Sequence, residues 1–483
     1  MTDLSRAGVA ETAHRIAEGD LTSRVVVEEA LARIGAADPG LNAFTLVLAD
    51  EARAEATARD EQLASGGALG PLHGVPIAIK DEIDVAGTVT SFGGDANSTP
   101  VTADAELVRR LRAAGAVIVG KTTMPEFGAF PYTESASRGV TRNPWDRTRT
   151  PGGSSGGTAV AVAAGMVPAG IGGDGGGSIR IPSACCGLFG LKPQRGRVSV
   201  APQPHLWWAL GTAGPLTRTV LDSAIVYDAI RGHVDTDLFR AGDAPSFTEA
   251  ARREPGRLRI GWTTRSAARG MRPDPVHVRA VADAARLLAD LGHDVREVDP
   301  RYPDPTAAFV PQFLAGVRAG SDAVEHFERL ERRTRQTYRL GSWVRPGVID
   351  RALAATEKVS ARANRVFDEI DVLLTPAIAH RPPRVGRLDG VGTIGAALRA
   401  MPAIAYAALW NVAGNPAASV PCGIAADGLP VAVQLVGRTD DEGTLFSLSA
   451  QLEQARPWPL LAGDERPVAV AATGARTSVE PQR

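Results

Sequence analysis

Short apolar runs alternate along the chain with longer stretches of helical periodicity, and this alternation is the feature that most restricts the fold. The runs 74–80 and 116–121 are typical of buried strands bounded by turn residues, and a helical stretch over 104–114 precedes the second. Further strands are predicted over 258–262, 294–298, 372–375, 418–420 and 431–436. This order predicts an α/β fold, in which helices cover the faces of a central sheet.

The N-terminal part is expected to be helical before the first of these strands. Helices are predicted over 4–18, after the capping pair Thr22 and Ser23, and over 41–65. The length of 483 residues would suggest about three domains of roughly 150 residues each. No linker or internal repeat separates such units, so length alone does not decide the domain number.

Charge and composition exclude several classes of protein. The 53 basic and 54 acidic residues leave a net charge of −1 with no basic stripe, so no nucleic-acid partner is expected. The most apolar stretch, 158–171, is interrupted by Gly165 and Pro168 and is too short to cross a bilayer. The N-terminus lacks an apolar signal segment, so a cytoplasmic enzyme without a membrane partner is predicted. The sequence leaves open whether the protein forms a homodimer.

Lysine is rare, and this rarity draws attention to the positions that keep it. Only four of the 53 basic residues are lysine, namely Lys80, Lys121, Lys192 and Lys358. Codon bias explains most of the excess of arginine. Since arginine never loses its proton in a protein whereas lysine can act as a base, the remaining lysines are candidates for chemistry.

The segment 152–178 is rich in glycine and serine and matches two generic motifs. Residues 170–175 fit GxGxxG, but a dinucleotide site needs an acidic residue about 20 positions further on, and the next 47 residues after Asp174 contain none. Residues 153–157 fit GxSxG around Ser155, but a loop precedes them and no histidine lies in a triad context. Neither motif has the setting that its chemistry requires.

A serine nucleophile that lacks a histidine partner can use a desolvated lysine as its base. Lys80 ends an apolar strand, Ser154 lies in the first glycine run, and Ser178 ends the second. The consecutive glycines 175–177 can direct several backbone N–H groups to one point, as an oxyanion hole requires. Taken singly, each feature is better explained by a turn, or by an ion pair of Lys80 with one of the two acidic residues that follow it. Their conjunction favours catalysis.

These residues and their surroundings resemble the amidase signature family. The resemblance rests on the runs 152–157, 176–182, 186–187 and 190–193, and it continues in order through 74–81, 120–127, 143–145, 214–218, 374–376, 414–416 and 428–434. It covers most of residues 1–455. The glycine-rich form of 173–178 is similar to the branch that includes nylon-oligomer (6-aminohexanoate cyclic dimer) hydrolases and other broad-substrate bacterial amidases.

The resemblance implies a Ser–cisSer–Lys triad in which Ser178 is the nucleophile, Ser154 relays a proton and Lys80 is the base. The step of 24 residues between the two serines is the family's own spacing. A cis peptide bond is expected before Ser154. The implied oxyanion hole consists of the N–H groups of Gly175, Gly176, Gly177 and Ser178. No metal or organic cofactor is implied.

Supporting roles follow from the same resemblance. Ser155 is expected to form hydrogen bonds that orient the relay, while Asp174 and Arg180 are expected to brace the loop. The extra glycine at 175, where the family commonly has a larger residue, is expected to open space beside the nucleophile. Apart from the resemblance, Lys121 and Lys358 are expected to tolerate arginine better than Lys80 does.

The implied fold is α/β, with one α/β/α amidase-signature domain over 1–465 and a mixed, twisted sheet of about eleven strands flanked by helices. Residues 466–483 are predicted to form a disordered tail. Residues 300–410 are the variable segment that shapes the acyl pocket. This segment contains Phe309, Phe313, Tyr338, Trp343, Tyr406 and Trp410, about half of which are expected to belong to the core.

The implied activity is acyl-transfer hydrolysis of hydrophobic or aryl carboxamides, with a small-molecule amide or carbamate as the substrate. The same triad would serve a carbamate (urethane) or ester hydrolase. A glutamine-amidotransferase subunit is a further alternative, although such subunits usually have glutamine where this chain has Ile181. A non-enzymatic scaffold would be expected to lose one of the triad residues, and all three are present.

Overall fold

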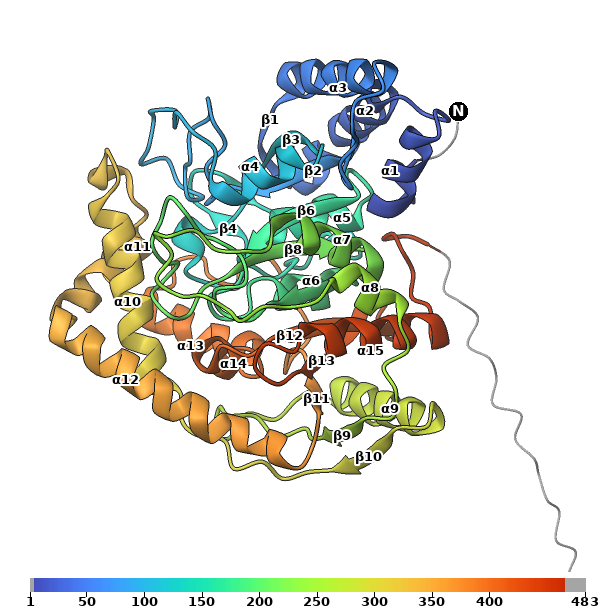
Figure 1. The fold of residues 1–483 in the computed structure, drawn as a ribbon. Coiled ribbons are helices and arrows are strands. Elements are labelled where there is room, and N and C mark those ends of the chain that lie inside the picture. Colours follow the sequence, from blue (N-terminus) through green and yellow to red (C-terminus); the bar gives the residue numbers. More distant parts are fainter. Residues whose placement is uncertain (1–3, 465–483) are drawn as a thin grey trace, which may run out of the picture.

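The computed structural model describes residues 4–464, and a large central sheet organises them (Figure 1). Its strands are β1 (Phe44–Val47), β2 (Pro76–Lys80), β3 (Val117–Thr122), β6 (Ala169–Gly173), β7 (Phe189–Lys192), β8 (Ala213–Thr217), β9 (Arg259–Trp262), β10 (Asp294–Glu297), β11 (Val372–Pro376), β12 (Ala417–Ile424) and β13 (Pro430–Val436). A separate two-stranded hairpin is formed by β4 (Glu134–Ser135) and β5 (Gly139–Val140).

The eleven strands follow the order β1-β3-β2-β6-β8-β7-β12-β13-β11-β9-β10. Near one edge, β3, β2 and β6 are parallel, and at the other edge β11, β9 and β10 are parallel, while the strands between these groups pair antiparallel. In Figure 1 the sheet runs from β1 near the top of the molecule to β10 at the bottom. The sheet is therefore mixed, as predicted.

Helices cover both faces of the sheet. One face buries the largest apolar core beneath α1 (Val9–Ala17), α4 (Glu106–Ala113), α7 (Val220–Ile230), α8 (Phe247–Arg252), α9 (Pro275–Asp290) and α15 (Glu442–Ala455). The opposite face packs against α2 (Ser23–Leu41), α3 (Ala49–Ala64), α5 (Gly156–Ala163) and α6 (Arg180–Cys186), and nearer β11 against α10 (Thr306–Asp322), α12 (Pro346–Ala363) and α14 (Ala408–Ala413). Two remaining helices, α11 (Arg332–Leu340) and α13 (Thr393–Ile404), lie beside α10 and the segment 127–132.

The predicted single α/β/α domain and its eleven strands are confirmed, whereas one predicted helix is wrong in part. The structure divides the expected helix 41–65 into the edge strand β1 and the helix α3. β1 forms because its backbone pairs antiparallel with β3, although three of its four residues are not buried. The predicted tail 466–483 lies outside the described residues. None of the helices within 4–464 has both the length and the apolar character needed to span a bilayer.

Candidate active site

Two parallel strands bring the predicted catalytic residues to one edge of the sheet. β2 is buried throughout and ends at Lys80, while its parallel neighbour β6 ends at Gly173 and leads into the loop that carries Ser178. Because parallel strands have their carboxyl ends at the same edge, the lysine and this glycine loop meet there. The loop before α5 contributes Ser154 from the side.

Lys80 and Ser154 form the core of the site. Lys80 Nζ donates a hydrogen bond of 2.8 Å to Ser154 Oγ, and both side chains are almost completely buried. The peptide bond between Gly153 and Ser154 is cis, as the sequence analysis expected. The lysine–serine half of the implied relay is thus in contact.

Ser178 lies in the same loop system but makes no such contact. Within the described chain its Oγ forms no hydrogen bond with another protein group, and none with Ser154 Oγ. Ser178 keeps 9% of its surface exposed, compared with 2% for Ser154 and 0% for Ser155. Of the three serines, Ser178 is therefore the one that a substrate reaches most easily.

The glycine loop presents backbone donors next to Ser178. Across residues 4–464, the N–H groups of Gly175, Gly176 and Ser178 have no protein acceptor. The N–H of Gly177 differs, because it donates to Asp174 Oδ1 at 2.7 Å. Gly177 has a φ of +120° and therefore requires glycine. The N–H of Gly177, one of the four expected oxyanion donors, thus forms a hydrogen bond within the loop instead.

A buried ion pair holds this loop in place. Asp174 and Arg180 are fully buried, with 3.0 Å between the Asp174 Oδ1 and Arg180 Nη2 atoms. Burial alone would raise the pKa of Asp174, but Arg180 and the hydrogen bond from Asn411 outweigh it and lower that pKa below its usual range. Arg180 also donates to Asn411 Oδ1 at 2.7 Å and to Gln434 Oε1 at 2.8 Å. Asp174 and Arg180 thus brace the loop, as predicted. No role had been predicted for Asn411 and Gln434, whose side-chain amides contact Arg180.

Ser155 supports the loop and does not contact the relay. Its Oγ donates to the Gly173 carbonyl oxygen at 3.2 Å and accepts from the Gly173 N–H at 3.3 Å. These two bonds fasten the start of α5 to the end of β6. Ser155 was expected to orient the relay by direct hydrogen bonding. In the structure it acts indirectly, because it holds the end of β6.

The space expected beside Gly175 is filled. A Cβ placed on Gly175 would lie only 2.7 Å from the ring of Trp207. Trp207 also covers Gly316 of α10 and meets Phe313 edge-on, with 5.2 Å between the ring centroids. Phe309 stacks on Phe313. The glycine at 175 thus admits an aromatic side chain and does not leave an open space.

We expect Gly175→Ala to lower kcat/KM roughly tenfold, because overpacking against Trp207 displaces either the ring or the adjacent amide donor. Gly176→Ala is the matched control, since its Cβ would meet Phe309 at the milder distance of 3.3 Å. Adding Trp207→Ala to Gly175→Ala should restore part of the loss. Steady-state kinetics on the three variants check this, and equal losses for both alanines would contradict it.

The other aromatic residues of 300–410 divide between core and surface. Tyr406 and Trp410 are buried, and Trp410 belongs to the core beneath α10, α12 and α14. Trp343 is 50% exposed, and Tyr338 packs beneath the guanidinium of Arg318. Phe309 and Phe313 are the two that approach the catalytic loop.

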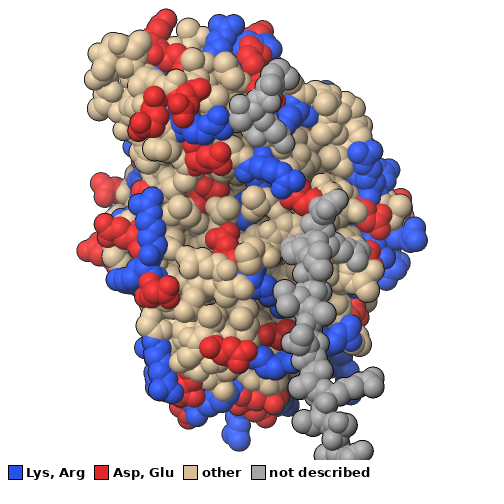
Figure 2. Space-filling view, turned by 90° about the vertical axis from the view of Figure 1, so that its right-hand side faces the viewer, with Lys and Arg blue, Asp and Glu red and all other residues tan. Residues whose placement is uncertain are grey.

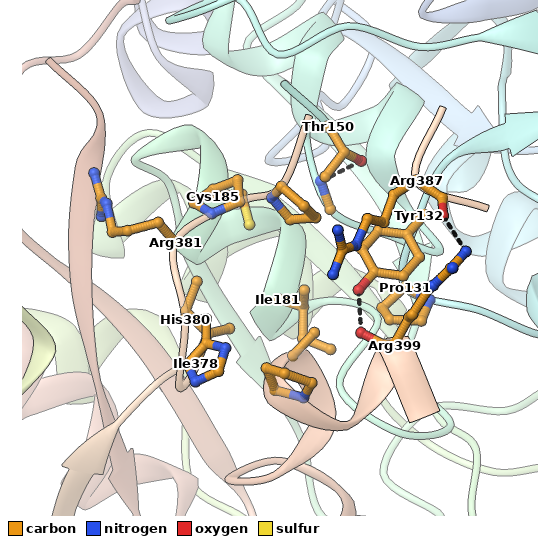
Figure 3. A pocket seen from close by; sticks show the side chains of 15 residues that line it. Pro131, Tyr132, Thr150, Ile181, Cys185, Ile378, His380, Arg381, Arg387 and Arg399 are labelled. Carbon is orange, nitrogen blue, oxygen red and sulfur yellow. Dashed lines mark hydrogen bonds between the residues drawn. The ribbon is translucent and has the colours of Figure 1, made fainter. Parts of the chain in front are cut away.

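A cavity of about 100 Å³ adjoins the other side of the catalytic loops (Figure 3). Its wall includes Gly152, two residues before Ser154, and Ile181, three residues after Ser178. Further apolar lining comes from Pro131, Tyr132, Cys185, Ile378, Pro382, Pro383, Pro402 and Ala403. The basic lining groups are His380, Arg381, Arg387 and Arg399, and no Asp or Glu is among the lining residues described.

Arg387 and Arg399 are the arginines of this cavity for which the described residues provide no carboxylate partner, and Arg399 donates to the Arg387 carbonyl oxygen. Arg381 pairs with Asp427, whereas no ion pair of Arg387 occurs in the described part of the chain. Figure 3 shows the Arg387 guanidinium beside the Tyr132 ring. Burial raises the pKa of Tyr132 to about 12 although Arg387 opposes the shift, so this phenol stays neutral. The cavity is thus apolar with a cationic edge.

Three of the four lysines are buried, which agrees with the interpretation that lysine is kept where arginine would not serve. Lys80, Lys121 and Lys192 are each at most 1% exposed, whereas Lys358 is on the surface. Lys121 pairs with Asp81 at 3.1 Å and donates to Thr90 Oγ1 at 3.0 Å. Burial lowers the pKa of Lys192 well below its usual value. The expectation that Lys121 tolerates arginine is not supported by so enclosed a position.

Two further residues at the site had not been singled out. The Glu82 carboxylate lies 3.0 Å from Lys80 Nζ. Gly128, at a φ of +64°, brings its backbone so close that a Cβ there would lie 2.9 Å from Ser154 Oγ. Glu82 was expected only as one of two acids that could pair with Lys80. Gly128 lies one residue beyond the run 120–127 that carries part of the family resemblance.

Charge elsewhere is mixed, and no metal-binding cluster is formed by the residues described. Figure 2 shows acidic and basic side chains interspersed on the face it presents. Within 4–464, no three His, Cys, Asp or Glu side chains are grouped so that they could hold a metal ion.

Comparisons with known proteins agree on one family. The family model described as Amidase matches residues 25–446. The Mycobacterium tuberculosis (strain ATCC 25618 / H37Rv) protein named "Putative amidase AmiB2" is 48% identical over 465 residues, which cover 95% of this chain and 98% of that protein.

Two solved structures show the same fold. A 6-aminohexanoate cyclic dimer hydrolase complexed with substrate superposes with a TM-score of 0.87 at 29% identity, covering 94% of this chain and 98% of that one. A bacterial aryl acylamidase of the amidase signature family superposes with a TM-score of 0.86 at 28% identity, covering 96% and 100%. The similarity to a 6-aminohexanoate cyclic dimer hydrolase agrees with the branch that the glycine-rich loop had indicated.

Proposed function

Since this chain belongs to the amidase family and is an amide-hydrolysing enzyme, we propose that it works by acyl transfer to Ser178, with Ser154 and Lys80 as a proton relay. The observation that carries the proposal is the 2.8 Å hydrogen bond between Lys80 and Ser154 beside the unpartnered amides of the Ser178 loop. Nucleophile, base and oxyanion donors are the three parts that covalent amide hydrolysis needs.

The reaction proceeds in two halves. Ser178 Oγ attacks the amide carbonyl carbon while its proton passes to Ser154 Oγ and the Ser154 proton passes to neutral Lys80. The amides of Gly175, Gly176 and Ser178 stabilise the oxyanion, and Gly177 holds the loop through Asp174. The relay then returns a proton to the leaving amine, and water hydrolyses the acyl-enzyme by the same path in reverse.

The Ser178 and Ser154 hydroxyl groups must come together for this transfer. Rotation about χ1 of either serine changes the distance between the two oxygens without moving the backbone. Catalytic hydrogen bonds often tighten only when substrate is bound. The absence of a bond between these hydroxyls in the free protein is therefore compatible with the relay.

Apolar side chains near the Ser178 loop favour amides with apolar substituents. Trp207 lies against Gly175 and Phe309 against Gly176, Phe313 packs on both rings, and the 100 Å³ cavity has Ile181 in its wall. An amide has an acyl and an amine substituent, and we assign one to each region. Hydrophobic carboxamides and anilides fit this arrangement.

The charge of the cavity disfavours cationic amides. Its charged edge is formed by arginines, and no acidic side chain lines it to bind an ammonium group. Glutamine carries an α-ammonium that would have to be desolvated there without a partner, which is costly. This is a physical reason to prefer hydrophobic amides over the glutamine-amidotransferase alternative.

We expect kcat/KM for an aryl amide to exceed that for glutamine by about two orders of magnitude or more, because an unpaired buried charge costs several kcal/mol. The purified chain is assayed on an anilide, an aryl carbamate and glutamine, with Ser178→Ala as the blank. Glutamine as the best substrate would overturn the substrate class. A carbamate faster than the anilide would move the assignment to urethane hydrolysis by the same triad.

Arg387→Glu tests the charge argument directly. Because Arg387 is exposed and unpaired, reversing its charge should leave anilide hydrolysis nearly unchanged and raise kcat/KM for a cationic amide several-fold. Equal effects on neutral and cationic amides would contradict the role given to this cavity.

A further inference from the structure

Glu82 is built into the site next to the base. It lies two residues after Lys80, and its Oε1 is 3.0 Å from Lys80 Nζ with 11% of the side chain exposed. A Cβ on Gly173 would overlap with Glu82 Oε1, and one on Gly128 would lie 3.6 Å from its Oε2. The same glycines that frame the serines thus leave room for this carboxylate.

Lys80 Nζ has two partners within the described chain, Ser154 Oγ at 2.8 Å and Glu82 Oε1 at 3.0 Å. An ammonium or amine nitrogen held between two fixed oxygens has little freedom to rotate away. Glu82 therefore restricts Lys80 to the position from which it meets Ser154.

The other charged groups of the neighbouring elements are engaged elsewhere. Asp81 pairs with Lys121 beside β3, Asp174 after β6 pairs with Arg180, and Glu126 accepts from the Glu331 N–H. Asp84 accepts from Thr90, the neighbouring helix α5 carries no charged residue, and His205 of the loop 203–211 stacks on Trp208. Glu82 is the carboxylate that faces Lys80.

We propose that Glu82 is a positioning residue of the relay, whose carboxylate holds Lys80 against Ser154 and stabilises the ammonium group formed when the relay proton reaches Lys80. The inference rests on the proposed function, because it requires Lys80 to be the base. During attack the proton leaves Ser178 Oγ, passes through Ser154 Oγ and binds Lys80 Nζ. The new positive charge then lies beside the Glu82 carboxylate.

The role is comparable to that of the buried aspartate behind histidine in Ser-His-Asp hydrolases, which orients the base and stabilises its cation. Glu82 thus increases the maximal rate by acting through Lys80.

Glu82→Gln tests this role, because glutamine keeps the shape and removes the charge. We expect kcat to fall roughly 10- to 100-fold while KM changes little, since a charge-assisted interaction made in the transition state is lost. The measurement is kcat and KM, determined separately on one aryl amide.

Two matched variants accompany it. Glu82→Asp retains the charge, so it should recover part of the kcat that Glu82→Gln loses, and it serves if Glu82→Gln does not fold. Asp84→Asn removes a nearby acid that does not contact Lys80, and its kcat should stay near that of the wild type. A thermal melt of each variant checks folding.

An unchanged kcat in Glu82→Gln, a loss that appears mainly in KM, or a Glu82→Asp variant no faster than Glu82→Gln would overturn the role of Glu82. Failure of the proposed function shows itself differently, because Ser178→Ala or Lys80→Arg would then keep activity on the same substrate.

Discussion

Replacing Ser178 with alanine should abolish turnover, with a loss in kcat on the order of 10⁴-fold or more, because the covalent route disappears. The loop around Ser178 offers the unpartnered amides of Gly175 and Gly176, so the loss reflects the missing nucleophile and not a missing oxyanion hole. Burst kinetics with an activated ester should release about one equivalent of product per wild-type active site and none from the variant.

Ser155→Ala is the matched control, since Ser155 belongs to the rival GxSxG motif and lies one residue from Ser154. Its hydroxyl is fully buried and bonded to the Gly173 backbone, so its removal should reduce activity moderately through the loop. Mass spectrometry of the trapped acyl-enzyme locates the modified peptide. An acyl group on Ser155 would overturn the assignment of Ser178.

Much of the fold was predictable because its strands are short apolar runs that lie fully inside the sheet. β2, β3 and β13 are buried along their whole length, and such strands are recognised without periodicity. β1 was assigned to a helix because an edge strand of four residues has one buried position and depends on pairing with β3. Local sequence does not report that partner.

The site was predictable where residue type and spacing suffice. Lys80, Ser154 and the glycine loop came from the motifs, and the contact between Lys80 and Ser154 agrees with them. The position of Trp207 over Gly175 was not predictable, because it depends on a tertiary approach from a loop more than 30 residues away. The same holds for Asn411, which reaches Asp174 from α14.

The structure also changes the argument about Lys80. Asp81 was one of the two acids with which a structural Lys80 could have paired, but it forms an ion pair with Lys121. The acid beside Lys80 is Glu82. An arginine at 80 would keep a positive charge for Glu82, but Lys80 is as enclosed as Lys121, so a loss of activity is informative only in a variant that folds. Lys121→Arg is unsuitable as a mild control because Lys121 is enclosed, whereas the exposed Lys358→Arg is suitable.

Lys80→Arg should therefore inactivate the enzyme almost as fully as Lys80→Ala, with a loss in kcat/KM on the order of 10³-fold or more. A guanidinium does not lose its proton in a protein, so it cannot accept one from Ser154. Lys358→Arg should match the wild type. The measurement is kcat/KM for the three variants, with folding checked by thermal melt. Substantial activity in a well-folded Lys80→Arg protein would remove Lys80 from the relay, since no arginine at this position can serve as a base.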